Sequence, residues 1–251
     1  MSWKLLKYGF KRSHDEPRFF PEPKELKSHY DVVIIVGGGH GMACAYYLAK
    51  EHGITNVAVL EQGYIGGGNT GRNTAIIRSN YLTPEGIPFF NESVKLYEGL
   101  AKELNFNMLF NQMGRLDLGH TDSAVYGLRM RTEFNRILGV DSRLIGPKEI
   151  KKLVPPMDLR EGKNFPILAA LYHPPCGVIR HDAVVWGYGR GADRQGAELH
   201  PFTEVTGIDR TNGRVTGVET SQGLVKANTI ISATAGWSST IAKMVDLDLP
   251  I

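Results

Sequence analysis

The stretch of sequence that decides the fold is Tyr30-Asp31-Val32-Val33-Ile34-Ile35-Val36-Gly37-Gly38-Gly39-His40-Gly41. Residues 30–35 form a short β-branched apolar run without polar alternation, which is typical of a strand buried on both faces. A helical apolar pattern follows over 42–51 and closes at Gly53. A second apolar run, 57–60, ends on Glu61. Strand, glycines, helix, strand and acid in this order predict a βαβ unit that binds a dinucleotide.

The polar and glycine positions of this unit are its candidate cofactor contacts. Glycines let the backbone approach a pyrophosphate, whose charge then meets the N-terminus of the helix. Glu61 stands 20 residues after Gly41, where a carboxylate accepts ribose hydroxyls. The predicted contacts are Gly37, Gly38, Gly39, Gly41 and Glu61.

Val36 departs from the G-x-G-x-x-G pattern. In the best register, Gly38 and Gly41 take the second and third glycine positions, and Val36 replaces the glycine that permits the tight turn. The alternative register uses Gly37 and Gly39 and puts Met42 where helix and strand pack closely. We prefer the first register, which predicts a longer strand and a strained or shifted turn. The alternative is that Val36 only extends the strand and weakens cofactor binding.

A second glycine-rich segment, 62–74, indicates which dinucleotide is bound. An NAD-binding fold returns to a third strand here, whereas a long loop with one arginine suits the larger FAD. The alternative is a flexible surface loop. Arg78 follows among apolar residues, where a guanidinium can hold a carboxylate through two parallel hydrogen bonds; its alternative is an exposed ion pair. The loop's candidate cofactor contacts are Gly67, Gly68, Asn69, Thr70, Arg72, Asn73 and Thr74.

Composition excludes several other classes of protein. The 251 residues are 42% hydrophobic and 22% charged, enough to bury a core. A formal net charge of +3 does not argue for nucleic acid or an anionic membrane as partner. Two distant cysteines, Cys44 and Cys176, exclude a disulfide scaffold and a thiolate metal site, and favour a reducing, cytoplasmic location. No apolar run reaches the roughly 18 residues of a membrane-spanning helix, and residues 1–29 lack the features of a signal peptide.

Residues 30–41 and 66–81 together resemble the β subunits of heterotetrameric sarcosine oxidases, which belong to the D-amino-acid-oxidase-like group of FAD-dependent amine oxidoreductases. The resemblance runs from about Tyr30 to Ile251. It implies an α/β fold (α+β overall): a Rossmann-like FAD-binding domain with an inserted substrate domain, incomplete at the C-terminus. In the family, roughly another third would follow Ile251, with a flavin-facing lysine. The implied division is an N-terminal arm at 1–29, FAD-binding domain at 30–111 and 173–251, and substrate domain at 112–172.

The resemblance also assigns roles to single residues. It implies non-covalent FAD, and makes Arg78 the arginine that holds the substrate carboxylate. The run Arg180-His181-Asp182-Ala183-Val184-Val185-Trp186 resembles the site where a second flavin, FMN, is bonded covalently to a histidine, here His181. His173 is set aside because Pro174 and Pro175 place it in a turn. In the family, the backbone of Val205 faces adenine and Ala235-Gly236 lies near the pyrophosphate.

Further helices and strands are expected from periodicity and turn signals. Asn212-Gly213 predicts a hairpin turn. Helices are predicted at 89–104, 123–138 and 147–153 and from 183 through 186, and His181 or Asp182 can cap the last of these. Strands are predicted at 114–119, 203–208 and 215–220, followed by short segments at 224–225 and 229–231.

The function implied by the resemblance is FAD-dependent oxidation of a secondary amino acid, most directly sarcosine to glycine, with release or transfer of a one-carbon unit and formation of peroxide. Two alternatives stay open: a related dehydrogenase of N-methyl or D-amino acids, and an inactive nucleotide-binding fragment. The expected partners are a small amino acid and the other subunits of a hetero-oligomer, without nucleic acid, membrane or metal.

Overall fold

The computed structural model describes residues 24–160, 162 and 164–250, together with 3, 9, 10 and 20. Most of the predicted N-terminal arm therefore lies outside the described residues. The chain forms two compact units, one of residues 1–65 and 189–251 and one of residues 66–188. The boundaries between these units differ from the domain boundaries predicted from the sequence. The predicted domains stay predictions.

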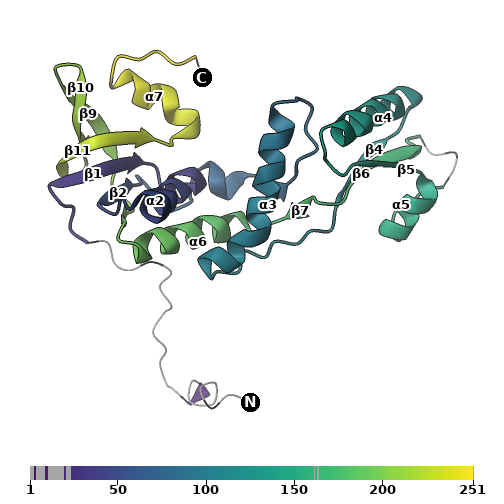
Figure 1. Cartoon of the computed structure of the whole chain (residues 1–251), viewed down its shortest axis with the longest axis horizontal. Helices are drawn as coiled ribbons and strands as arrows, with labels where there is room; N and C mark the ends of the chain where they lie inside the picture. Colours follow the sequence, from purple (N-terminus) through teal and green to yellow (C-terminus); the bar gives the residue numbers. More distant parts are fainter. Residues whose placement is uncertain are drawn as a thin grey trace. The chain divides into compact units, whose positions relative to one another are not determined.

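The first unit is built on a six-stranded mixed sheet (Figure 1). Four strands are parallel, and the last two run antiparallel to their neighbours. Along the sheet the strands are β8 (Glu198–His200), β2 (Val57–Leu60), β1 (His29–Ile35), β11 (Gly223–Ser232), β10 (Arg214–Thr220) and β9 (Val205–Thr211). The chain passes from β1 to β2 on one side and adds β11 on the other, so the strand order reverses between β1 and β11. Ligands of open α/β sheets bind beyond the carboxyl ends of the strands at this reversal.

Helices cover both faces of this sheet. The predicted first helix is confirmed as α2 (Gly39–His52), which begins three residues earlier than expected and ends at Gly53 with a left-handed φ of 67°. It packs on the face that carries Ile34. On the opposite face lies α7 (Ser238–Lys243) (Figure 1). Its Ile241 packs against the apolar cluster that contains Val33 and Ile35. The short 3₁₀ helix η2 (Ala235–Trp237) leads into α7.

The hairpin of the first unit confirms one prediction and corrects two. Asn212 and Gly213 have φ of 52° and 75°, the paired positive values of a tight hairpin turn. The expected short segments 224–225 and 229–231 are wrong as separate pieces. They form one strand, β11, because its first part pairs with β10 and the part from Lys226 onward pairs with β1. The strand expected at 203–208 begins at Val205 instead, since the Thr203 N–H donates to the Glu61 carbonyl.

A buried polar cluster ties β8 to the start of β1. The Tyr30 hydroxyl donates to Glu198 Oε2 at 2.7 Å, and Lys27 Nζ lies 2.8 Å from Glu198 Oε1. Burial would raise the pKa of Glu198, but hydrogen bonds from Lys27 and Tyr30 hold it below its usual value. Burial lowers the pKa of the adjacent His200. Pairing compensates the buried carboxylate and fixes this edge of the sheet.

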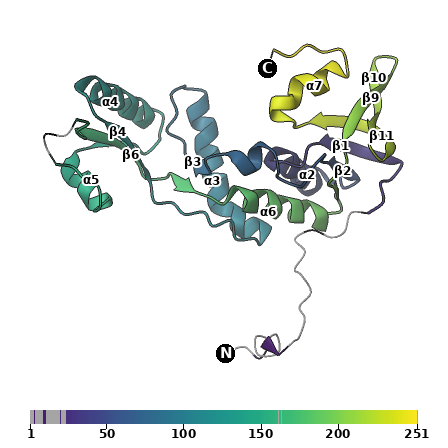
Figure 2. The same ribbon diagram turned by 180° about the vertical axis from the view of Figure 1, so that it is seen from behind.

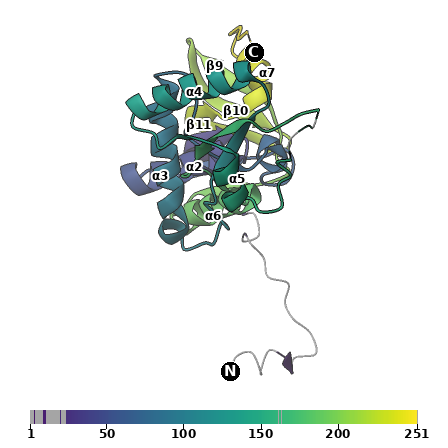
Figure 3. The ribbon, with the colours of Figure 1, turned by 90° about the vertical axis from the view of Figure 1, so that its right-hand side faces the viewer.

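The second unit contains a three-stranded antiparallel sheet, β4-β6-β5. Leu116 and Leu118 of β4 pack with α5, whereas Asp117 faces Arg131 of α4. The two helices therefore cover opposite faces of the sheet (Figures 1 and 2), and Figure 3 shows them from the side that lies to the right in Figure 1. These elements are β4 (Arg115–Gly119), α4 (Asp122–Ile137), β5 (Arg143–Ile145), α5 (Pro147–Leu153) and β6 (Ala169–His173).

The remaining elements of this unit connect the glycine-rich loop to the predicted flavin-attachment segment. The predicted helix at 89–104 is confirmed as α3 (Gly86–Leu104), with one additional turn at its start. The helix expected to run from 183 through 186 starts earlier and is longer: it is α6 (His181–Arg194). The short elements are η1 (Asn69–Arg72), β3 (Ile76–Ile77) and β7 (Gly177–Val178), and β3 pairs with β7.

Candidate functional site: a nucleotide-binding strand end and an arginine cluster

Val36 lies directly after β1 with a φ of 88°. A β-branched side chain with this backbone conformation is a genuine outlier, because Cβ crowds the backbone. The strand ends at Ile35, so the longer strand of the preferred register and the alternative in which Val36 extends it are both wrong. The strained turn of the preferred register is confirmed. The turn that a glycine makes easily is thus made here by valine at a cost in strain.

Gly41 is the position where helix and strand pack closely. A Cβ built on Gly41 would lie 2.1 Å from the Val36 carbonyl oxygen and 3.4 Å from Ile34 Cγ2. A Cβ on Gly37 would lie 2.8 Å from Ile65 Cδ1. Met42, which the alternative register puts at the close-packing position, has a fully buried side chain. The geometry therefore supports the register of Gly38 and Gly41.

Glu61 fixes the loop that follows β1. Its Oε2 accepts the Gly37 N–H at 3.0 Å, and its Oε1 accepts the Gly63 N–H at 2.9 Å. The side chain is 7% exposed. Each carboxylate oxygen has a second lone pair, so Glu61 holds the loop and keeps the capacity to accept ribose hydroxyls.

A cavity of about 170 Å³ opens at the carboxyl ends of the parallel strands of the first unit. Val36 and Gln62 line it from the ends of β1 and β2, Val205 lines it from β9, and Trp237 lines it from η2. The sequence-predicted Ala235-Gly236 pair lies in η2, directly before Trp237. The structure thus brings Val205 and the η2 turn to the strand ends where a nucleotide is expected.

The N-terminus of α2 adds an electrostatic feature to this strand end. Gly38 caps the helix without a side-chain hydrogen bond, and no acidic residue lies in the first turn. The helix has 14 residues, so its dipole gives this end a partial positive charge. The glycines lack a Cβ and so let a ligand approach the backbone closely, and the helix end carries a partial positive charge. Together with the cavity at the strand reversal, these features fit the pyrophosphate and nucleoside of a dinucleotide.

In the second unit, the glycine-rich loop is ordered by local bonds. Asn73 Nδ2 donates to the Thr70 carbonyl, and Asn73 Oδ1 accepts the Ala75 N–H, both at 2.7 Å. A Cβ on Gly66, whose φ is 80°, would lie 2.8 Å from Val185 Cγ1 of α6. The Ile179 N–H donates to the Ala75 carbonyl. The loop therefore lies against the start of α6, near His181.

His181 is the first residue of α6 and is partly exposed, with 29% of its side chain accessible. Its Nδ1 accepts the Asp182 N–H at 2.8 Å, so a neutral ring carries its proton on Nε2. Asp182 forms a bidentate pair with Arg180 at 2.9 and 2.7 Å. Although partial burial opposes it, this pairing lowers the pKa of Asp182. Because the Asp182 N–H occupies Nδ1, Nε2 is the ring nitrogen open to another bond.

Arg78 lies in a cluster of three arginines with one carboxylate. Asp117 accepts Arg115 Nε at 2.8 Å and lies 3.5 Å from Arg131 Nη1. Arg78 contacts a neutral group instead: its Nη1 donates to Asn80 Oδ1 at 3.1 Å, and its guanidinium lies 4.2 Å from the Tyr81 ring centroid. Among the described residues, no group accepts from Arg78 Nε or Nη2. The half-buried guanidinium therefore keeps two donors for an anion.

His173 ends β6 and is fully buried. Its Nε2 accepts the Ser79 N–H at 3.3 Å, so the ring proton is on Nδ1 and is donated to the Asp141 carbonyl at 2.8 Å. Burial lowers the pKa of His173. Both ring nitrogens have partners inside the unit, which gives His173 a structural role beside Arg78.

The neutral state of His173 predicts a loss of stability in acid. The folded pKa lies below the unfolded value, so between the two values the unfolded chain binds a proton that the folded chain excludes. The free energy of unfolding should fall by up to about 1.4 kcal/mol per pH unit as pH decreases below about 6.5. Urea unfolding at about pH 7.5 and about pH 5.5 measures this difference, which should be smaller in His173→Gln. An equal acid loss in both proteins would refute this role for His173.

Four residues of the cluster escaped sequence reasoning: Asn80, Arg115, Asp117 and Arg131. Asn80 is fully buried and contacts Arg78, Asp117 and Arg131. The signal was present, since Asp117 alternates with Leu116 and Leu118 and so had to face away from the apolar layer. The long-range contact between residues 80 and 131 had no signal in a single sequence.

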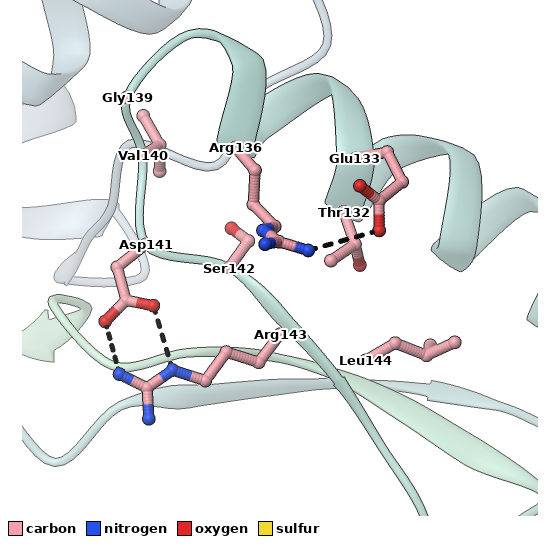
Figure 4. Close-up of a pocket in the computed structure, with 9 residues that line it drawn as sticks. All are labelled: Thr132, Glu133, Arg136, Gly139, Val140, Asp141, Ser142, Arg143 and Leu144. Carbon is pink, nitrogen blue, oxygen red and sulfur yellow. Dashed lines mark hydrogen bonds and ion pairs between the residues drawn. The ribbon is translucent and has the colours of Figure 1, made fainter.

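A separate polar cavity of about 710 Å³ lies between the end of α4 and β5. Figure 4 shows its two arginines paired with acids, Arg143 with Asp141 and Arg136 with Glu133. It contains none of the predicted site residues. Since both lining arginines already have acidic partners, we assign it no chemistry.

In the part of the chain that the structure describes, no group of three or more histidine, cysteine, aspartate or glutamate side chains could hold a metal ion. None of the helices in these same residues has the length and apolar character needed to cross a bilayer.

Comparison with known families decides the assignment of the fold. The family model described as "DAO: FAD dependent oxidoreductase" matches residues 31–251. The chain belongs to this family of FAD-dependent oxidoreductases. The FAD-dependent oxidoreductase fold that the resemblance implied is therefore confirmed.

Individual members of the family are also similar to the chain. The sarcosine oxidase subunit beta of Rhizobium meliloti (strain 1021) is 51% identical over 231 residues, which cover 92% of this chain and 55% of the relative. That of Rhodobacter capsulatus is 46% identical with the same coverage. The crystal structure of L-proline dehydrogenase from P. horikoshii superposes with a TM-score of 0.82 at 30% identity, over 90% of this chain and 58% of that one. The chain thus spans about half the length of these family members.

Proposed function

We propose that the chain is the FAD-binding and substrate-carboxylate-binding part of a sarcosine oxidase β subunit. The observation that carries this proposal is Arg78, a half-buried guanidinium that keeps two donors for an anion beside a neutral partner. The 51% identity to a sarcosine oxidase subunit beta supports the substrate class. The proposed reaction is oxidation of sarcosine to glycine, with release or transfer of a one-carbon unit and formation of peroxide.

FAD fits the first unit through the features of its strand ends. The pyrophosphate would approach Gly37, Gly38, Gly39 and Gly41 at the N-terminus of α2, and Glu61 would accept the ribose hydroxyls. Val205 lines the cavity proposed for the nucleoside, and Ala235 and Gly236 lie in the adjoining η2 turn. Bound FAD supplies the capacity to accept a hydride equivalent from a carbon next to nitrogen.

The cofactor contacts predicted in the glycine-rich loop of the second unit stay predictions. Gly67, Gly68, Asn69, Thr70, Arg72, Asn73 and Thr74 combine exposed backbone groups, hydroxyls and one cation. This set is suited to an anion or to the polar edge of a flavin.

Arg78 would hold the substrate through its carboxylate. An arginine fork and a carboxylate match in geometry, and the two parallel hydrogen bonds fix the orientation of a small amino acid. The aromatic ring of Tyr81 supports the guanidinium from one face. This contact would fix the orientation of the amino acid before it reacts.

His181 is the proposed attachment site of a second flavin, FMN. Its Nε2 is the ring nitrogen without a backbone partner, so Nε2 is the atom that would hold the flavin. The Asp182 N–H fixes the ring through Nδ1, and Arg180 fixes the Asp182 carboxylate.

His181→Ala should abolish covalent flavin completely and leave non-covalent FAD in place. The protein and its variant are precipitated with acid, and the flavin absorption of pellet and supernatant is compared. His120→Ala is the matched control, because it removes an exposed histidine of the same unit and should not affect attachment. Covalent flavin that survives in His181→Ala would refute the attachment site.

Activity tests the substrate proposal. With its partner subunits, the protein should reduce its flavin with sarcosine and form peroxide in air. Flavin reduction without peroxide would indicate the dehydrogenase alternative, and reduction by D-amino acids but not by sarcosine would contradict the proposal.

The name "subunit beta" of the relatives supports other subunits as partners. A cytoplasmic location stays a prediction.

A further inference from the structure

Asn80 joins Arg78 to the only carboxylate of the arginine cluster. Its side chain is fully buried, with Oδ1 3.1 Å from Arg78 Nη1 and Nδ2 3.2 Å from Asp117 Oδ2. Only one orientation of the amide satisfies both contacts, because a guanidinium donates and a carboxylate accepts. The cluster therefore contains a chain of contacts from Asp117 through Asn80 to Arg78.

Asn80 is itself held from a second side. Its carbonyl oxygen accepts Arg131 Nε at 3.2 Å and also contacts Arg131 Nη2 and Arg78 Nη1. The preceding residue, Ser79, is fixed by its N–H bond to His173. The backbone and the side chain of Asn80 are thus held in one conformation by these hydrogen bonds. The guanidinium of Arg78 is therefore oriented by a rigid neighbour.

The charges in the cluster are distributed unevenly. Arg115 and Arg131 both contact Asp117, whereas Arg78 is bound through the neutral amide of Asn80. A carboxylate at position 80 would orient Arg78 as well, but it would also compete with any anion for the same guanidinium. The amide orients Arg78 without neutralising it.

We propose that Asn80 is a positioning residue for carboxylate recognition. Its neutral amide fixes the guanidinium of Arg78, and Asp117, which contacts the other side of the same amide, carries the compensating negative charge. This inference rests on the proposed role of Arg78 as the carboxylate-binding residue. On this account, Asn80 is the reason why Arg78 stays able to bind an anion and is not already paired with an acid.

The charge exchange Asn80→Asp/Asp117→Asn tests the proposal. The double variant keeps the net charge, the side-chain shapes and the acceptor–donor match between positions 80 and 117, so it should fold. Acetate and its neutral analogue acetamide are the probes, and isothermal titration calorimetry of the protein measures their affinities. The variant should bind acetate at least about tenfold more weakly than the wild type, with acetamide unaffected. A variant that binds acetate as tightly as the wild type would overturn the proposal.

Two further variants separate this inference from the proposed function. Arg78→Gln should lose acetate binding; if it does not, the proposed role of Arg78 fails, and the inference fails with it. If Arg78→Gln loses acetate while the exchange variant does not, only the role of Asn80 fails. Should the exchange variant not fold, Asn80→Ala serves instead. Asn80→Ala should weaken acetate binding, and it should raise the KM for sarcosine by a larger factor than it lowers kcat. A wild-type acetate affinity together with a wild-type KM would overturn the proposal.

Discussion

Gly41→Ala is expected to abolish flavin binding and to destabilise the fold by about 3 kcal/mol or more, because overpacking against a backbone atom has no cheap relaxation. The new Cβ would lie 2.1 Å from the Val36 carbonyl oxygen, so β1 and α2 must separate. Val36 already has a φ of 88°, and the turn has little freedom left to adapt. Urea unfolding gives the loss of stability, and the flavin absorption of the purified protein gives the loss of cofactor.

Gly99→Ala is the matched control for this variant. Gly99 lies in the middle of α3, and a Cβ there would meet nothing within 4 Å. Alanine should therefore raise the free energy of unfolding by up to about 1 kcal/mol, the difference in helix propensity, and leave flavin content unchanged. Equal behaviour of the two variants would contradict the close approach of helix and strand at Gly41.

Arg78→Gln is expected to have the second large effect. Two charge-assisted hydrogen bonds to a carboxylate are lost, and at about 1.5–3 kcal/mol each they correspond to a KM for sarcosine raised by about 100-fold or more. Arg78→Lys keeps the charge but loses the fork and should be intermediate. Steady-state kinetics with the partner subunits present measure both KM and kcat, and kcat should change less than KM.

The control for Arg78 is an arginine on the exposed surface of α4. Arg129→Gln removes the same side chain from an exposed position, so it should leave KM within about twofold. A KM that changes equally in both variants would mean that net charge, and not the position of Arg78, determines substrate binding.

The first βαβ unit was predictable because its signals are local. The apolar runs, the glycines and Glu61 lie within one stretch of chain, and each corresponds to a contact seen in the structure. Val36 shows the limit of such reasoning. The sequence indicates that a glycine is missing from the turn, but the positive φ depends on how β1, Gly41 and the loop pack together.

Strand lengths and the arginine cluster were harder to predict for physical reasons. β11 looks like two short segments because its two ends pair with different strands, and a single sequence does not record pairing partners. Arg78 is identified by its apolar neighbours and by family resemblance, yet Asn80, Asp117 and Arg131 surround it only through contacts between residues far apart in the chain. The loop at 69–72 forms a 3₁₀ turn through Asn73, which a glycine count cannot predict.

The absorption spectrum of the purified protein before and after acid precipitation tests the central proposal most directly. We expect flavin bands in the native protein, a flavin with the mass of FAD in the acid supernatant, and a second flavin retained in the pellet on the peptide that contains His181. A protein that binds no FAD, even when titrated with it, would contradict the proposal that the strand ends around Gly41, Glu61 and Val205 form a flavin nucleotide site.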